Sequence, residues 1–178
     1  MVEVPDEIRR RCEEYCRDRA RALETDEPTW WGWEAFLWLT TVDSVLKVHR
    51  NPKEFLQELA VYLRLAGRGE KPLQGFHIPI LLHYDEKRLV LELSFVKPPY
   101  VLDFGRALLD AVPAGFDPEE REWTAEKQRL YGARWPEVIR LLDALRHLGI
   151  YYTDVHERNI CFETSPDADA ELSSPQEF

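Results

Sequence analysis

The alternation of apolar and polar positions predicts a chain that begins with a helix and continues with short strands. Apolar residues recur every three or four positions near the start, with Arg and Glu between them, which predicts an amphipathic helix ending before Pro28. Four of the six tryptophans lie within residues 29–41, a composition that favours two short strands around Gly32. Residues 44–49 predict a third strand, which stops at the turn signal Asn51-Pro52.

The same pattern predicts alternating helices and strands further along. Residues 52–65 predict a helix, residues 78–84 and 88–95 predict a hairpin, and Lys97-Pro98-Pro99 breaks the pattern. We expect a shorter helix over 101–111, a long helix ending at Leu148-Gly149, and a short strand at 159–162. The predicted buried face of the long helix consists of Trp135, Val138, Leu141, Leu142 and Leu145. The tail 164–178 has no Lys or Arg, and we expect it to be disordered.

Length and charge narrow the classes of function. A chain of 178 residues with 44% hydrophobic content suits one domain with a continuous core. A net charge of -10 would repel a phosphate backbone, so nucleic acid is a poor partner. The apolar runs are too short to cross a bilayer, and the start lacks a signal-peptide pattern, so we expect a cytoplasmic protein without a membrane span.

Asp154 and Asn159 stand five positions apart, between the predicted long helix and the last predicted strand. Each could simply cap a turn through its side chain. The same spacing joins the base aspartate and the metal-binding asparagine of the kinase motif H-R-D-L-x-x-x-N. The segment 152–159 therefore resembles a catalytic loop of the protein kinase-like superfamily, with Tyr152 and Thr153 in place of His and Arg. His156 makes it similar to the D-x-H-x-x-N loops of aminoglycoside, choline and lipopolysaccharide-core kinases.

This resemblance implies an α+β, two-lobed fold, either a minimal, atypical bacterial-type kinase or a pseudokinase. An N-terminal amphipathic helix (1–28) would precede a small N-lobe (29–96) with an antiparallel sheet and one helix. A truncated, mostly helical C-lobe (97–163) would carry the catalytic-type loop, followed by the acidic tail (164–178).

The resemblance also assigns roles to residues. Lys47 resembles the strand lysine of V-A-I-K, and Glu58 resembles the helix glutamate that pairs with it, so the two would orient the phosphates of ATP. Without the resemblance, Lys47 would be interpreted as an exposed strand lysine and Glu58 as a solvent-exposed helix acid. Asp154 would position the acceptor hydroxyl as the catalytic base, and Asn159 would bind Mg²⁺.

The hinge of this family would run along Glu92, Leu93 and Ser94, where backbone groups could meet the adenine ring of the cofactor. Ordinary core packing explains these three residues equally well.

Two departures weaken the resemblance. Gly32 is the only glycine between the first two predicted strands, where kinases carry a glycine-rich loop. The metal aspartate of D-F-G should follow Asn159, and the candidates there are Asp167, Asp169 and Glu171. The tripeptide Asp103-Phe104-Gly105 does occur, but it precedes Asp154. We interpret it as the start of a helix with Phe104 packed beneath, since a functional role needs a rearranged chain order.

Three functions follow. The first is an ATP- and Mg²⁺-dependent phosphotransferase acting on an unknown hydroxyl acceptor, either protein Ser/Thr or a small molecule. The second is a catalytically impaired pseudokinase that serves as a nucleotide-binding or protein-interaction module. In the third, the aromatic-rich region 30–38 is an interaction surface or simply core.

Overall fold

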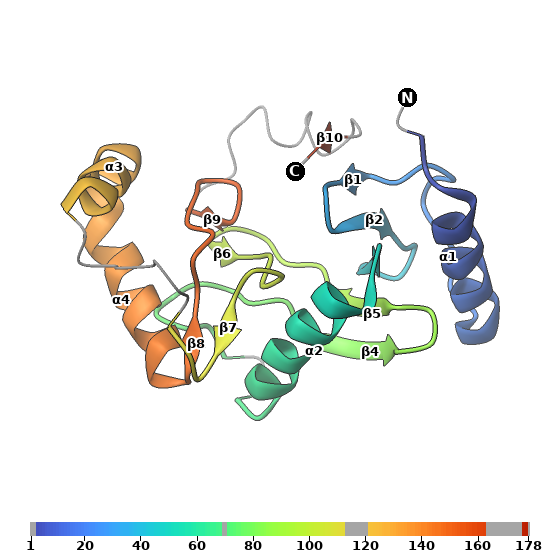
Figure 1. Cartoon of the computed structure of the whole chain (residues 1–178). Coiled ribbons are helices and arrows are strands. Elements are labelled where there is room, and N and C mark those ends of the chain that lie inside the picture. Colours follow the sequence, from blue (N-terminus) through green and yellow to red (C-terminus); the bar gives the residue numbers. More distant parts are fainter. Residues whose placement is uncertain (1–2, 69–70, 113–120, 163–175, 178) are drawn as a thin grey trace.

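The computed structural model describes residues 3–68, 71–112, 121–162 and 176–177, and its architecture is α+β as predicted (Figure 1). Its helices are α1 (Asp6–Arg19), α2 (Pro52–Ala66), α3 (Arg121–Tyr131) and α4 (Trp135–His147), with a short 3₁₀ turn (Gly132–Arg134) between the last two. Its strands are β1 (Trp30–Trp31), β2 (Ala35–Leu39), β3 (Ser44–His49), β4 (Leu81–Asp85), β5 (Val90–Ser94), β6 (Tyr100–Val101), β7 (Leu108–Leu109), β8 (Ile150–Tyr151), β9 (Ile160–Cys161) and β10 (Gln176–Glu177).

The main sheet has the order β10-β1-β2-β3-β5-β4, and β1 to β5 pair antiparallel. Strand β3 lies between β2 and β5, where Lys47 is opposite Leu37 and Leu91. Because side chains alternate along a strand, Leu46 and Val48 face one side of the sheet and Lys47 faces the other. The sheet is thus two-sided, with a helix on each face.

Helix α1 covers one face of the sheet, and α2 lies on the opposite side (Figure 1). The α1 face closes over a separate apolar cluster that includes Tyr15, Trp38 and Leu46, all fully or almost fully buried. The apolar residues on the α2 face are continuous with the core of the C-terminal helices, so the described residues form two apolar cores separated by the sheet. Burying apolar side chains in this way supplies the main driving force for folding.

Local signals explain why α2 and α4 form where the sequence predicts them. Asn51 caps α2, since its side-chain oxygen accepts hydrogen bonds from the backbone N–H groups of Lys53 and Glu54 at 3.1 and 3.3 Å. Helix α4 buries the predicted apolar face, and the chain leaves it at Gly149, whose φ of 73° suits glycine. The predictions for these helices are confirmed, as are those of the first helix, the β4–β5 hairpin and the last short strand.

The helix predicted over 101–111 is wrong. The chain there is strand β6, an irregular loop and strand β7, with φ values of 53° at Asp103 and 55° at Asp110 that a helix cannot contain. Strand β6 pairs antiparallel with β9, and β7 pairs antiparallel with β8. The apolar spacing that indicated a helix belongs instead to an extended segment whose Val101, Phe104 and Ala107 are buried.

The predicted tail lies outside the described residues, except for Gln176 and Glu177, which form β10 beside β1. The candidates Asp167, Asp169 and Glu171 lie outside them too. Within the described part of the chain, no helix is long and apolar enough to cross a bilayer, as predicted.

Candidate functional site

A buried lysine from the central strand contacts two carboxylates from different elements. Lys47 of β3 is only 5% exposed, and its Nζ lies 2.8 Å from Glu58 Oε2 and 2.9 Å from Asp103 Oδ1. Glu58 comes from α2 and is fully buried, whereas the Asp103 side chain is one-third exposed. The predicted Lys47–Glu58 pair is therefore present, and a third residue joins it.

The local sequence explains this convergence. Glu58 lies on the buried stripe of α2 with Phe55, Leu59 and Tyr62, so the helix presents it to the sheet. Asp103 adopts a left-handed backbone, which aspartate tolerates better than most residues, and its Oδ1 accepts a hydrogen bond from Gly105 N at 3.1 Å. Phe104 is fully buried, with edge-on contacts to the rings of Tyr62 and Tyr152. Phe104 thereby anchors the turn that carries Asp103.

Electrostatics keep all three groups charged at neutral pH. Burial by itself would lower the pKa of Lys47, but Asp103 and Glu58 together raise it above its ordinary value. Burial would likewise raise the pKa of Glu58 and of Asp103, yet the attraction of Lys47 reverses this, and the pKa of each carboxyl is lowered. One lysine is thus shared by two carboxylates in this cluster.

Glu58 also contacts His49, whose Nε2 lies 2.8 Å from Glu58 Oε2. His49 is fully buried, and its Nδ1 has no hydrogen-bond partner among the described residues. His49 and Lys47 thus share Oε2 of Glu58, and together they fix the orientation of its carboxylate.

The predicted catalytic loop follows β8 and is hydrogen-bonded to residues 102–105, which we call the Asp103 segment. The Tyr152 hydroxyl donates to Leu102 O at 2.7 Å, and Leu102 N donates to Asn159 O at 2.8 Å. Within the loop, Asn159 Nδ2 donates to Asp154 O at 3.1 Å. The residue next to Asp103 is thus bonded to both ends of the loop that carries Asp154 and Asn159.

The charges of Asp154 and Asp103 act on the same two neighbouring groups, Arg106 and Tyr152. The pKa of Arg106 is raised by its hydrogen bond with Glu34 and also by the charges of Asp154 and Asp103. The pKa of Tyr152 is raised by burial and then by the same two aspartates. The Asp154 side chain is 28% exposed, and its Oδ1 lies 3.7 Å from His156 Nε2.

The three predicted hinge residues separate onto different sides of the sheet. The Glu92 side chain faces α1, where it accepts hydrogen bonds from Arg21 and Tyr15, so it points away from Lys47. Leu93 is on the Lys47 face and is packed in the core there. The Ser94 hydroxyl accepts a hydrogen bond from Ile80 N at 2.8 Å.

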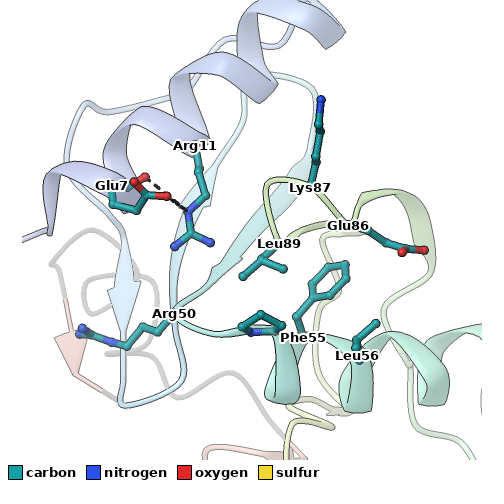
Figure 2. Close-up of a pocket in the computed structure, with 9 residues that line it drawn as sticks. Glu7, Arg11, Arg50, Phe55, Leu56, Glu86, Lys87 and Leu89 are labelled. Carbon is teal, nitrogen blue, oxygen red and sulfur yellow. Dashed lines mark hydrogen bonds and ion pairs between the residues drawn. The ribbon is translucent and has the colours of Figure 1, made fainter.

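A separate pocket of about 480 Å³ lies between α1, the start of α2 and the β4–β5 turn. Figure 2 shows Arg11 projecting from α1 above an apolar floor that includes Phe55 and Leu89. None of the predicted site residues lines this pocket.

The interpretation of Asp103 as the start of a helix is wrong, because Asp103 has a φ of 53° and lies in an irregular loop, whereas the predicted burial of Phe104 is confirmed. The sequence analysis missed His49, Glu34 and Arg106, for which no motif exists. In the described part of the chain, no group of three or more His, Cys, Asp or Glu residues is arranged to hold a metal ion. A metal here would need further ligands from a substrate.

Comparison with known proteins assigns no family to the chain. No protein-family model matches the sequence, and no curated protein matches it. The structure is similar to that of the aminoglycoside phosphotransferase APH(2")-IIa in a ternary complex with streptomycin and ATP, with a TM-score of 0.41 and 14% identity. The match covers 89% of this chain and 43% of the other, so this chain spans less than half of that length. The likeness is distant and assigns no activity.

Proposed function

We propose that the chain binds ATP with Mg²⁺ beside Lys47, Asp103 and Asn159 and transfers the terminal phosphoryl group to a hydroxyl acceptor. The observation that carries this proposal is the contact of Lys47 Nζ with both Glu58 and Asp103 at 2.8–2.9 Å. The hydrogen bonds between the Asp103 segment and the loop that bears Asp154 and Asn159 support it.

Lys47 and Glu58 would position the phosphates. Glu58 contacts Lys47 from the buried side of the cluster, and Asp103 is the partially exposed member of the cluster. A ligand phosphate that reaches Lys47 must therefore come from the Asp103 side. A lysine held by a helix glutamate is the arrangement that kinases use to orient the α- and β-phosphates.

Asp103 and Asn159 are the residues that would hold Mg²⁺. Lys47 and Gly105 N both contact Oδ1 of Asp103, which leaves Oδ2 for a ligand. The Asn159 amide nitrogen is bonded to Asp154 O, which leaves its amide oxygen. Carboxylate and amide oxygens suit Mg²⁺, which proteins commonly hold through one or two side chains plus substrate phosphates. Bound there, Mg²⁺ would neutralise charge on the transferring phosphoryl group.

Asp154 would act as the catalytic base. It would accept the proton of the acceptor hydroxyl while a bond forms from that oxygen to the γ-phosphorus and the bond from the γ-phosphorus to ADP breaks. The exposed fraction of Asp154 leaves room for an acceptor at the surface.

The proposed role of Asp103 reverses the chain order of the kinase motifs, in which D-F-G follows the catalytic loop. Here β6 and Asp103 come before α4 and the loop, and the pairing of β6 with β9 compensates for the change. Because β9 directly follows Asn159, this pairing brings the Asp103 segment beside the loop irrespective of order.

The second candidate function is a catalytically impaired module that binds nucleotide or protein. Two observations favour it: Gly32 is the only glycine in the β1–β2 turn (residues 32–34), and the carboxylate of Glu34 from the same turn lies against Gly105. A carboxylate at this place competes with phosphates for space.

Unfolding in urea with and without MgATP tests the proposal. At one hundred times its dissociation constant, MgATP should stabilise the wild-type chain by about 2.7 kcal/mol. Asp103→Asn should lose the Mg²⁺-dependent part of this stabilisation, whereas Asp110→Asn, on the same segment but paired with the exposed Arg64, should keep it. No stabilisation of the wild type at saturating MgATP would overturn the proposal.

A turnover assay separates the two candidate functions. If the wild type binds MgATP and forms ADP with a hydroxyl acceptor or water, Asp154→Asn should reduce the rate by about a hundredfold or more while MgATP affinity is retained. Binding without ADP formation would favour the impaired module.

A further inference from the structure

An ion pair bridges the β1–β2 turn and the residue after the Asp-Phe-Gly turn. Arg106 Nε lies 3.0 Å from Glu34 Oε1. The Arg106 side chain is 61% exposed and the Glu34 side chain 22%, so the carboxylate is the more enclosed partner. The ion pair thereby links the β1–β2 turn to the segment that carries Asp103.

Gly105 shows how closely Glu34 approaches the Asp103 turn. A Cβ atom on Gly105 would clash with Glu34 Oε2 and would lie 3.2 Å from Asp103 Oδ1. The carboxylates of Glu34 and Asp103 therefore lie against the same face of Gly105. Two like charges in one place repel each other, and the arrangement persists because Arg106 neutralises Glu34 while Lys47 neutralises Asp103.

Arg106 lies beside the same carboxylates as the proposed site. Its backbone oxygen accepts a hydrogen bond from Thr153 Oγ1 at 3.4 Å, which places it next to the catalytic-type loop. Asp154 and Asp103 both act on its pKa, as described above. A guanidinium binds phosphate oxygens through two parallel hydrogen bonds, as it binds a carboxylate. Arg106 is thus a second cation at the edge of the site, and an internal anion occupies it.

We propose that Arg106 binds the terminal phosphate of ATP and that Glu34 occupies Arg106 in the ligand-free chain as an internal competitor. This inference rests on the nucleotide site proposed above. When ATP binds, its terminal phosphate replaces the Glu34 carboxylate at Arg106. The β1–β2 turn then moves Glu34 away from Gly105. ADP lacks the terminal phosphate and binds without this exchange.

Dissociation constants for MgATP and MgADP, measured by calorimetry, test the exchange. Arg106→Gln should raise the dissociation constant of MgATP about tenfold, because a charge-assisted pair is lost, and should leave that of MgADP unchanged. Glu34→Gln should lower the dissociation constant of MgATP about threefold, because ATP no longer has to break a partially exposed ion pair. Glu137→Gln removes the comparable Arg134–Glu137 pair on another part of the surface and should change neither constant.

The double variant Glu34→Gln/Arg106→Gln shows whether Glu34 acts through Arg106. Its MgATP affinity should equal that of Arg106→Gln alone. If Glu34→Gln still improves binding in the Arg106→Gln background, its effect is one of general charge and the inference is wrong. Weaker MgATP binding by Glu34→Gln, or equal losses of MgATP and MgADP affinity in Arg106→Gln, would also overturn it while leaving the nucleotide site standing. Failure of the wild type to bind either nucleotide would sink both proposals.

Discussion

Two glutamates, Glu58 and Glu92, are fully buried on opposite faces of the same sheet, and their surroundings differ in charge. Glu92 accepts hydrogen bonds from Arg21 Nε at 2.6 Å, from the Tyr15 hydroxyl at 2.8 Å and from Ser44 Oγ at 3.0 Å. One acid faces one permanent base, so the Glu92 cluster is balanced. It fastens α1 and the segment after it to the sheet.

In the Glu58 cluster one lysine is shared, because Lys47 faces both Glu58 and Asp103. His49 contacts Glu58 as well, and the charge of Asp103 also acts on Arg106. Burial alone therefore does not distinguish Glu58 from Glu92. The Glu58 cluster differs in that one of its carboxylates, Asp103, is one-third exposed.

The largest effect should come from Glu58→Leu. This change leaves Lys47 with Asp103 alone and leaves buried His49 without its carboxylate partner. Breaking a buried ion pair by removing one member costs about 3–5 kcal/mol of unfolding free energy, which urea denaturation would measure. A loss below about 1 kcal/mol would show that the cluster relaxes easily and would weaken the contrast.

Glu92→Leu should cost less, about 1–2 kcal/mol. Tyr15 retains its contact with His83 Nδ1 at 3.0 Å, Ser44 retains Thr40, and the Arg21 side chain, 26% exposed, can reach water. MgATP affinity, measured by calorimetry, should not change. A large loss of affinity in this variant would contradict the assignment of the Glu92 cluster to structure.

Acid should weaken the Glu58 cluster in a defined direction. The pKa values of Glu58 and Asp103 lie below their ordinary 4.5 and 3.8, so their stabilisation is complete above those values and is lost as the pH falls through the lowered values. Asp103→Asn should therefore lose less stability than the wild type on acidification. Urea unfolding in steps from about pH 6 to pH 3 measures the difference, and identical curves would argue against it.

Ser44→Ala should have the smallest effect. It removes one of the hydrogen bonds to Glu92 while Arg21 and Tyr15 remain, so we expect a loss of about 1 kcal/mol or less. Thermal unfolding would detect it. A loss as large as that of Glu92→Leu would mean that Ser44, rather than Arg21, holds the carboxylate.

The spacing of apolar residues within short segments predicted most of the helices and strands. The order of the motifs predicted two residues of the candidate site, Lys47 and Glu58. Apolar spacing in α2 and α4 and the β-branched run of β3 are properties of short segments, so the sequence reveals them directly. Lys47 and Glu58 followed from a motif order that this chain keeps. Their contact in the structure confirms the geometry of that pair, and their roles toward a nucleotide stay predictions.

Long-range pairing accounts for what the sequence did not reveal. Residues 101–111 have apolar residues three apart, yet they pair with strands that come much later, and a local window cannot register that partner. Asp103 was given no functional role because its tripeptide precedes the catalytic-type loop in the chain. The fold nevertheless brings it to Lys47. The direction of Glu92 also depended on α1 covering the sheet, which spacing within β5 does not specify.

The reversed motif order has a consequence for synthesis on the ribosome. Lys47, Glu58 and Asp103 all lie in the first 103 residues, so the charged trio can assemble before α4 and the final loop have been translated. The edges of β6 and β7 must then wait for β9 and β8, which are translated later.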